Sequence, residues 1–239
     1  MISTRMPLAL SIALLLGILA MPAAAQTKPA AAAMPMPAQT KPAVASTSAA
    51  VQAKPAVSTA ASDKTAVKLA TEVCSSCHGP GGNSKSPTFP RLAGQRQAYL
   101  VAQIKAFKDG QRHEQEAHDY MLGMTMLIDD ATAQALGRYF ASQPHPKGIP
   151  GNPAQVAAGK KVYEQGIPGS VPPCASCHGA QAQGDSTMHP RLADQHAAYI
   201  VRQLNVIQRN LRNSPEMHGI IKNLKPEDMK NVAAYLQSL

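Results

Sequence analysis

All four cysteines of the 239-residue chain lie in two copies of one short motif, Cys-x-x-Cys-His-Gly. The motif spans residues 74–79 and recurs 100 residues later, at 174–179. Two thiols spaced by two residues on a tight turn can form thioether bonds to both vinyl groups of one porphyrin, and the adjacent histidine is then held beneath the iron. In an exported chain, this spacing is the attachment signature of c-type haem. The predicted haem thiols are Cys74, Cys77, Cys174 and Cys177, and the predicted proximal ligands are His78 and His178.

Two other uses of paired cysteines fit the motif less well. A zinc site built from four cysteines usually spaces its pairs closely, whereas 96 residues separate Cys77 from Cys174. Two disulfides suit an oxidising compartment, but they give no reason for a histidine after each pair. The glycine after each histidine lets the backbone turn away without a side chain striking the ring. The prediction is therefore two covalently attached haem c groups.

A second axial ligand for each iron must come from later in the sequence. Met121 and Met217 occupy matching positions, 96 residues apart. A thioether sulfur is a neutral, polarisable ligand that favours ferrous iron and so raises the reduction potential. Methionine is also a common filler of cores, and Met124 and Met126 compete with Met121 for this role. We predict Met121 and Met217 as the sixth ligands of the two irons.

Ligation by two histidines is the alternative. It would use His113 or His118 in the first half of the chain and His218 in the second. His218 aligns with neither of the other two, so a surface position is favoured for these side chains.

Two further pairs of residues lie close to the motif. Pro90 and Pro190 follow the proximal histidines at equal distances, and we expect their region to supply a carbonyl to the imidazole N–H, which would fix the ring orientation. Arg91 and Arg191 can reach haem propionates, with a solvated surface position as the equal alternative.

The two motifs belong to an internal duplication. Pro90-Arg-Leu-Ala recurs at Pro190-Arg-Leu-Ala, and several later residues match at the same offset of 100. Toward the end of each copy the offset falls to 96, so the first copy has four extra residues within 113–120. A connector rich in proline and glycine separates the copies. We predict a first domain at 62–143, a linker at 144–153 and a second domain at 154–239.

Hydrophobic spacing predicts helices and loops, without a convincing alternating strand. Each copy is expected to contain a first helix before the cysteine motif, a middle helix and a last helix, with the sixth ligand on a loop before the last helix. The predicted helices are Lys64–Val73, Gln95–Lys108 and Ala131–Ser142 in the first copy, and Ala154–Glu164, Gln195–Arg209 and Pro226–Ser238 in the second. Nine aromatic residues are few for two small cores, so a porphyrin in each is expected to supply the large flat apolar body.

The N-terminal quarter has a different composition. One cation, a short apolar run and Ala23-Ala24-Ala25 predict a secretory signal at 1–25, with an uncleaved anchor as the alternative. Residues 26–61 contain three near-copies of Gln-Thr-Lys-Pro-Ala, which block a continuous helix and offer little large apolar surface. We predict a disordered tether there, either a spacer that provides reach or an inert leader.

The formal charge of +9 does not indicate nucleic-acid binding once it is divided along the chain. The signal holds one of the cations and the tether holds three, and haem propionates would lower the remainder further. The chain has no apolar run long enough for a polytopic membrane protein, and its apolar fraction is too high for wholesale disorder.

The paired Cys-x-x-Cys-His units, the following Pro-Arg-Leu-Ala-x-Gln stretches and the methionines before the last helices resemble the cytochrome c4 family, over about 64–239. The resemblance implies an all-α fold of two tandem class I cytochrome c domains, each three to five helices around a covalently bound haem. It implies axial pairs of His78 with Met121 and of His178 with Met217, and domains related by a pseudo-twofold axis with the haems near their interface. The long tether and the insertion before Met121 depart from the family pattern.

The predicted function is electron transfer, with no catalytic residues and no small-molecule substrate. The resemblance implies a periplasmic carrier between redox proteins of the respiratory chain, from a quinol-oxidising complex toward a terminal oxidase; peripheral membrane association stays open. The alternative is an enzymatic role, as a dihaem peroxidase-like protein or as the cytochrome subunit of a periplasmic dehydrogenase. The peroxidase requires one iron without a sixth ligand.

Overall fold

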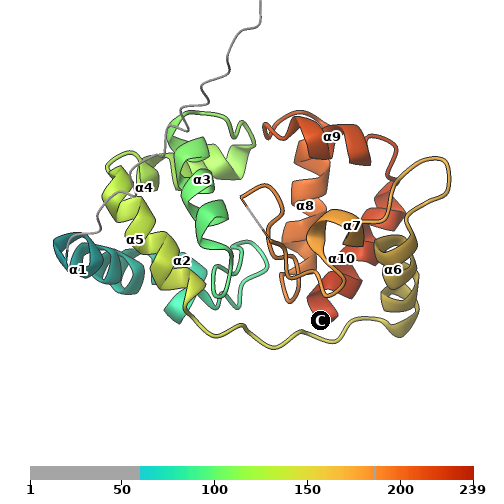
Figure 1. Ribbon diagram of the computed structural model, residues 1–239, viewed down its shortest axis with the longest axis horizontal. Coiled ribbons are helices and arrows are strands. Elements are labelled where there is room, and N and C mark those ends of the chain that lie inside the picture. Colours follow the sequence, from blue (N-terminus) through green and yellow to red (C-terminus); the bar gives the residue numbers. More distant parts are fainter. Residues whose placement is uncertain (1–59, 186) are drawn as a thin grey trace, which may run out of the picture. The chain divides into compact units, whose positions relative to one another are not determined.

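The computed structural model describes residues 60–185 and 187–239, so the predicted signal and nearly all of the predicted tether lie outside the described residues. The first copy of the duplication is helical (Figure 1). Its helices are α1 (Ala60–Leu69), the π-helix η1 (Ala70–Cys74), α2 (Ser75–His78), the 3₁₀ turn η2 (Pro80–Gly82), α3 (Gln97–Lys108), the π-helix η3 (Ala117–Leu122), α4 (Gly123–Thr125) and α5 (Asp130–Ala141).

The second copy repeats this order with fewer elements (Figure 1). Its helices are α6 (Pro153–Gln165), α7 (Ala175–His178), α8 (Ala197–Gln208), α9 (Pro215–Ile221) and α10 (Pro226–Ser238). The bounds of α10 are those predicted, and α6, α3, α8 and α5 start and end within two residues of the prediction. Within the described residues the sheet content is limited to two isolated bridges, which confirms the all-α fold class.

The sequence prediction of a loop before each last helix was wrong. In both copies the segment that carries the candidate methionine is helical: η3 in the first and α9 in the second. In α9, Pro215 lies in the first turn, where a backbone N–H would have no partner within the helix, so its absence does not destabilise the helix. The negative charge of Glu216 in the same turn interacts favourably with the positive end of the helix dipole. The first copy follows its four-residue insertion with a π-helix, a rare form that occurs often at functional sites.

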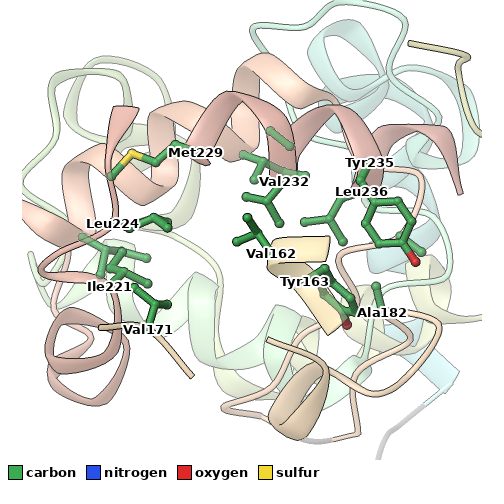
Figure 2. Close-up of a cluster of buried hydrophobic side chains, with 14 residues drawn as sticks. Val162, Tyr163, Val171, Ala182, Ile221, Leu224, Met229, Val232, Tyr235 and Leu236 are labelled. Carbon is green, nitrogen blue, oxygen red and sulfur yellow. The ribbon is translucent and has the colours of Figure 1, made fainter. Parts of the chain in front are cut away.

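The second copy has a large apolar core built mainly on the packing of α6 against α10 (Figure 2). Fourteen buried apolar side chains form it, with Tyr163 and Met229 fully enclosed. Gly159 of α6 lies directly against the Asn231 carbonyl of α10, where any Cβ would collide. The two helices therefore approach at a distance that only glycine permits, and the core forms around that contact.

The first copy has a smaller core between α1, α3 and α5. Six apolar side chains are buried in it, of which three are alanines. The last helix of this copy is capped by Asp129, whose carboxylate accepts a hydrogen bond from the backbone N–H of Thr132. With so few large side chains, the first copy has less buried apolar area than the second to stabilise its interior.

Reciprocal hydrogen bonds join the two copies. The side-chain amide of Gln95 bonds the backbone N–H and C=O of Arg191 at 2.8 and 2.9 Å, and the amide of Gln195 bonds those of Arg91 at 2.9 and 3.0 Å. The backbones of residues 112 and 212 also form an antiparallel bridge. Residues that match at the sequence offset of 100 therefore make the same contacts from opposite sides of the boundary between the copies.

Candidate haem-binding sites

Both predicted proximal histidines are buried at the ends of short helices. His78 closes α2 and His178 closes α7, with 6% and 5% of their surface exposed. Nδ1 of His78 lies 2.8 Å from the carbonyl oxygen of Pro90, and Nδ1 of His178 lies 3.1 Å from that of Pro190. The prediction that these prolines supply an orienting carbonyl is confirmed. The following residues, Gly79 and Gly179, have φ of 75° and 81°, so the tight turn after each histidine requires glycine.

The protonation of these rings suits a metal ligand. Burial lowers the pKa of both histidines, and the carbonyl bond only partly opposes that change, so the rings are neutral at pH 7. In a neutral imidazole that donates through Nδ1, Nε2 carries the lone pair. Nε2 of His178 is buried and has no hydrogen-bond partner. A buried nitrogen of this kind is costly unless a ligand takes it, which is what haem iron would do.

All four cysteines carry free thiols, so neither pair forms a disulfide. Burial raises the pKa of Cys74, and it raises that of Cys174 to about 11. Among the described residues, no group of three or more His, Cys, Asp or Glu side chains gathers as a metal ion would require. The arrangement therefore offers nothing for the zinc alternative and leaves four thiols available for thioether bonds.

A cavity of about 760 Å³ connects the two motifs. Its lining includes both proximal histidines and all four cysteines, together with side chains from the middle and last helices of each copy. Met121 of η3 and Met217 of α9 are half-buried and line it too. The structure thus brings together all eight residues predicted from the sequence as haem ligands or attachment sites.

The competing sulfur atoms are placed differently. Met126 lies outside the cavity lining and is more than half exposed, and Met229 is enclosed in the second core, as predicted for a filler. Met124 does line the cavity, but 58% of its surface is exposed. The half-buried Met121 is the better placed of the two first-copy candidates to exclude water from an iron.

The histidines of the alternative ligation lie outside the cavity lining. His113 and His118 are exposed, beside a separate small pocket. Nδ1 of His218 lies 3.1 Å from the carbonyl of Ile207 in α8. These positions favour surface and structural roles over ligation.

Arg91 and Arg191 both line the cavity. Arg91 is buried and donates to the backbone carbonyl of Asp194 in the other copy, so the solvated-surface alternative was wrong for it. Arg191 pairs with the carboxylate of Asp194 and is partly exposed. Both guanidinium groups therefore lie at the cavity wall, where they would be able to pair with the propionate carboxylates of a bound haem.

Sequence reasoning assigned no role to a buried polar network at the meeting of the two copies. Arg112 and Arg212 bond the side chains of both Gln103 and Gln203 at 2.6 to 3.0 Å, and Arg112 also pairs with Glu114. The carboxylate of Glu114 thus bonds Arg112 directly and acts on Arg212 only through its charge. The available signal was the alignment of both arginines and both glutamines at the offset of 100, which marked them as equivalent without showing that they touch.

The residues present fit haem. A neutral histidine offers nitrogen, a methionine offers sulfur, two thiols stand on the preceding turn, and the apolar cavity has cationic groups at its wall.

Comparison with known proteins gives the same result for both copies. The family model for cytochrome c matches residues 64–144 and again 156–239. Cytochrome c4 of Pseudomonas aeruginosa is 34% identical over 75% of this chain and 90% of its own, and cytochrome c-552 of Acidithiobacillus ferridurans is 39% identical over 75% and 79%.

The chain belongs to the cytochrome c4 family.

A solved structure supports this assignment. Cytochrome c4 of Acidithiobacillus ferrooxidans has a TM-score of 0.65 and 40% identity, covering 70% of this chain and 98% of that one. As a member of this family with two cytochrome c domains, the chain binds two haem c groups, one in each copy. Within residues 60–185 and 187–239, no helix is long and apolar enough to cross a membrane.

Proposed function

We propose that the chain is a periplasmic electron carrier of the respiratory chain, which passes electrons from a quinol-oxidising complex toward a terminal oxidase. The observation that carries the proposal is the pairing, in one cavity, of a buried neutral histidine and a half-buried methionine for each haem. Haem iron supplies a one-electron change between its ferric and ferrous states.

The protein's own groups keep that change free of other chemistry. The carbonyls of Pro90 and Pro190 fix the tautomer and orientation of the proximal rings, so the lone pair of Nε2 stays available to a ligand. Met121 and Met217 would fill the sixth positions and so deny a substrate an open site. Thioether ligation favours the ferrous state, and the buried cations Arg91, Arg112 and Arg212 oppose the added positive charge of the ferric state.

The proposal assigns two axial pairs, His78 with Met121 and His178 with Met217, and four thioether sites, Cys74, Cys77, Cys174 and Cys177. It places the protein outside the cytoplasm after export, with redox proteins as its partners. Nucleic acid and small-molecule substrates have no part in the proposal.

The test is spectroscopy of the purified exported protein. Two low-spin ferric haems with the methionine-to-iron charge-transfer band, and no peroxide turnover, are expected of a carrier. Appreciable high-spin haem together with peroxide turnover would instead establish the peroxidase-like alternative. Intact mass then reports the haem count and the mature N-terminus together.

A further inference from the structure

Exposed apolar side chains gather on one short segment of the first copy. Four of the large apolar residues that are most open to solvent lie within eight consecutive positions, just after the insertion. Leu127 is the extreme case, with 97% of its surface exposed. The residues are Tyr120, Met124, Met126 and Leu127, and we call them the 120–127 patch. Such a concentration on a small domain commonly marks a site of interaction.

The patch is continuous with the wall of the haem cavity. Tyr120 and Met124 line the cavity, so part of their exposed surface faces the haem site, whereas Met126 and Leu127 lie outside the lining and face solvent. The ring of Tyr120 meets that of Phe89 edge to face at 5.5 Å, and Phe89 meets the ring of His78 in the same manner at 6.1 Å. Aromatic contacts therefore lead from the patch to the proximal ligand of the first haem.

Acidic side chains surround the patch. Residues 113–137 include five acids and neither a lysine nor an arginine. Glu114 is buried against Arg112, and Glu116 lies 3.7 Å from the guanidinium of Arg202, so the acids that count toward the rim are the three aspartates. Asp119 and Asp130 are exposed on either side of it, and Asp129 stands at the start of α5. Lys105 and Lys108 are neighbouring cations; Lys105 pairs with Asp109, and the ammonium of Lys108 donates to the Ile128 carbonyl. The rim therefore has an excess of negative charge.

The second copy lacks this surface at the matching positions. At the offset of 96, Glu216 replaces Tyr120, Lys222 replaces Met126 and Asn223 replaces Leu127. None of the exposed large apolar residues of the described chain falls within 213–225. The ring next to His178 is His189 rather than a phenylalanine. The patch is thus a property of the first copy and does not follow from the shared fold.

We propose that the 120–127 patch is the docking surface through which the first haem exchanges electrons with a protein partner, one that presents an apolar centre ringed by lysine and arginine. An apolar centre with a charged rim is the usual anatomy of a protein interface, and small interfaces suit brief redox encounters. The acidic rim selects the charge of the partner and accelerates its approach. The inference rests on the proposed carrier function and names one of the carrier's partner surfaces.

Charge argues against an anionic lipid surface as the occupant. Such a surface carries negative charge and would repel Asp119, Asp129 and Asp130, whereas a basic protein would be attracted by them. The 120–127 patch is therefore assigned to a protein partner.

The test exchanges residues between the copies. Met126→Lys/Leu127→Asn gives the first copy the residues of the second, and both side chains are exposed, so the fold should be unaffected. Lys222→Met/Asn223→Leu makes the reverse change on exposed positions of the second copy. Val67→Asn removes an exposed apolar side chain on α1 and serves as the matched control.

The probe is tris(phenanthroline)cobalt(III), an apolar cation that accepts one electron from the reduced protein and becomes cobalt(II). Its stopped-flow oxidation rate should fall roughly three- to tenfold in Met126→Lys/Leu127→Asn, rise in the reverse variant, and decline with salt in the wild type. Hexacyanoferrate(III), an anion, should react with the first variant no more slowly than with the wild type. Redox-inert zinc-substituted mitochondrial cytochrome c, a lysine-rich protein, should compete with the cobalt complex on the wild type and not on that variant.

The outcomes separate the two proposals. Equal cobalt rates in the wild type and Met126→Lys/Leu127→Asn, with both haems still oxidised, overturn the docking surface and leave the carrier intact. If anionic lipid vesicles compete with the cobalt complex and the basic protein does not, the 120–127 patch is a membrane contact, and the proposal of a protein partner is overturned. Haems that neither probe oxidises reversibly overturn the carrier function itself.

Discussion

The two copies are alike in the contact that orients each proximal histidine and in the bonds that join them, and they differ in their cores and in the segments that carry the candidate sixth ligands. The imidazole-to-carbonyl contact is repeated, at 2.8 Å in one copy and 3.1 Å in the other. The contact between the copies is also reciprocal, through Gln95 and Gln195. Cofactor attachment and the joining of the copies thus impose the same geometry on both halves.

The interiors and the distal segments have diverged. The second core encloses fourteen apolar side chains and the first encloses six. At matching positions, Met229 fills the second core where the first has Ala133. The candidate sixth ligand lies in an α-helix in the second copy and in a π-helix in the first. Two copies with different cores and different distal helices can bind the same cofactor if their ligands occupy equivalent positions.

Removal of the thiols should have the largest effect, the loss of one haem, and the accompanying loss of helix should differ between the two copies. Cys74→Ser/Cys77→Ser and Cys174→Ser/Cys177→Ser should each lose one haem, measured by intact mass. The first variant should also lose more helix by circular dichroism, because a small core cannot replace the apolar area of the porphyrin. Ser76→Ala and Ser176→Ala keep both thiols and should change neither reading. Equal loss of helix in the two double variants would show that core size does not decide apoprotein stability.

The substitutions Met121→Ala and Met217→Ala should have the second-largest effect, which is on the spectrum and the reduction potential of one haem each. Each should remove one methionine-to-iron band and lower the reduction potential of one haem by on the order of 0.1 V, because a good sulfur ligand is lost. Potentiometric titration with optical detection measures both effects. Met124→Ala and Met126→Ala are the matched controls. A band that survives in Met121→Ala and disappears in Met124→Ala would show that the π-helix presents the other sulfur.

Gln95→Leu and Gln195→Leu should have smaller and nearly equal effects, because this is where the copies are alike. Each substitution removes both bonds to the opposite arginine backbone and leaves a buried N–H and C=O without partners. The expected loss is about 1–3 kcal/mol of unfolding free energy, measured by denaturant titration. Gln155→Leu changes an exposed glutamine and should have little effect. Clearly unequal losses of unfolding free energy in the two variants would contradict the equivalence of the Gln95 and Gln195 contacts.

The helix caps should show the smallest difference. Asp129 caps α5, whereas Lys225 at the same position before α10 makes no side-chain cap. Asp129→Ala should slightly lower the unfolding free energy, and Lys225→Asp should slightly raise it. The hydrogen bond from Thr132 lowers the pKa of Asp129, so its contribution is complete above the ordinary aspartate range and is lost as the pH falls through the lowered pKa. Denaturation at neutral and acidic pH measures this, and a gap between wild type and Asp129→Ala that persists in acid would exclude capping as its cause.

Regular elements and the proximal site were predictable because their determinants are local. The last helix begins at Pro226, as its first-turn residues indicate, and the cysteine motif fixed the thiols and the ring beside them. The distal helices were missed for different reasons: Pro215 and Glu216 are local signals for the start of α9 that the prediction did not use, whereas the π-helix of the first copy follows an insertion and has no side-chain cap to indicate it. The role of Arg112 and Arg212 was hidden for another reason: a buried charge becomes visible only when its partners from the other copy are placed.

The sequence alone determined the haem motif, the duplication, the all-α class and the candidate ligands, since each is encoded in residue type and short spacing. Tertiary structure decided which methionines reach the cavity, how Gln95 and Gln195 join the copies, and that four exposed apolar residues lie within 120–127 of the first copy and none at the matching positions of the second. Those properties depend on distances between residues far apart in the chain, which burial and packing set and periodicity does not record.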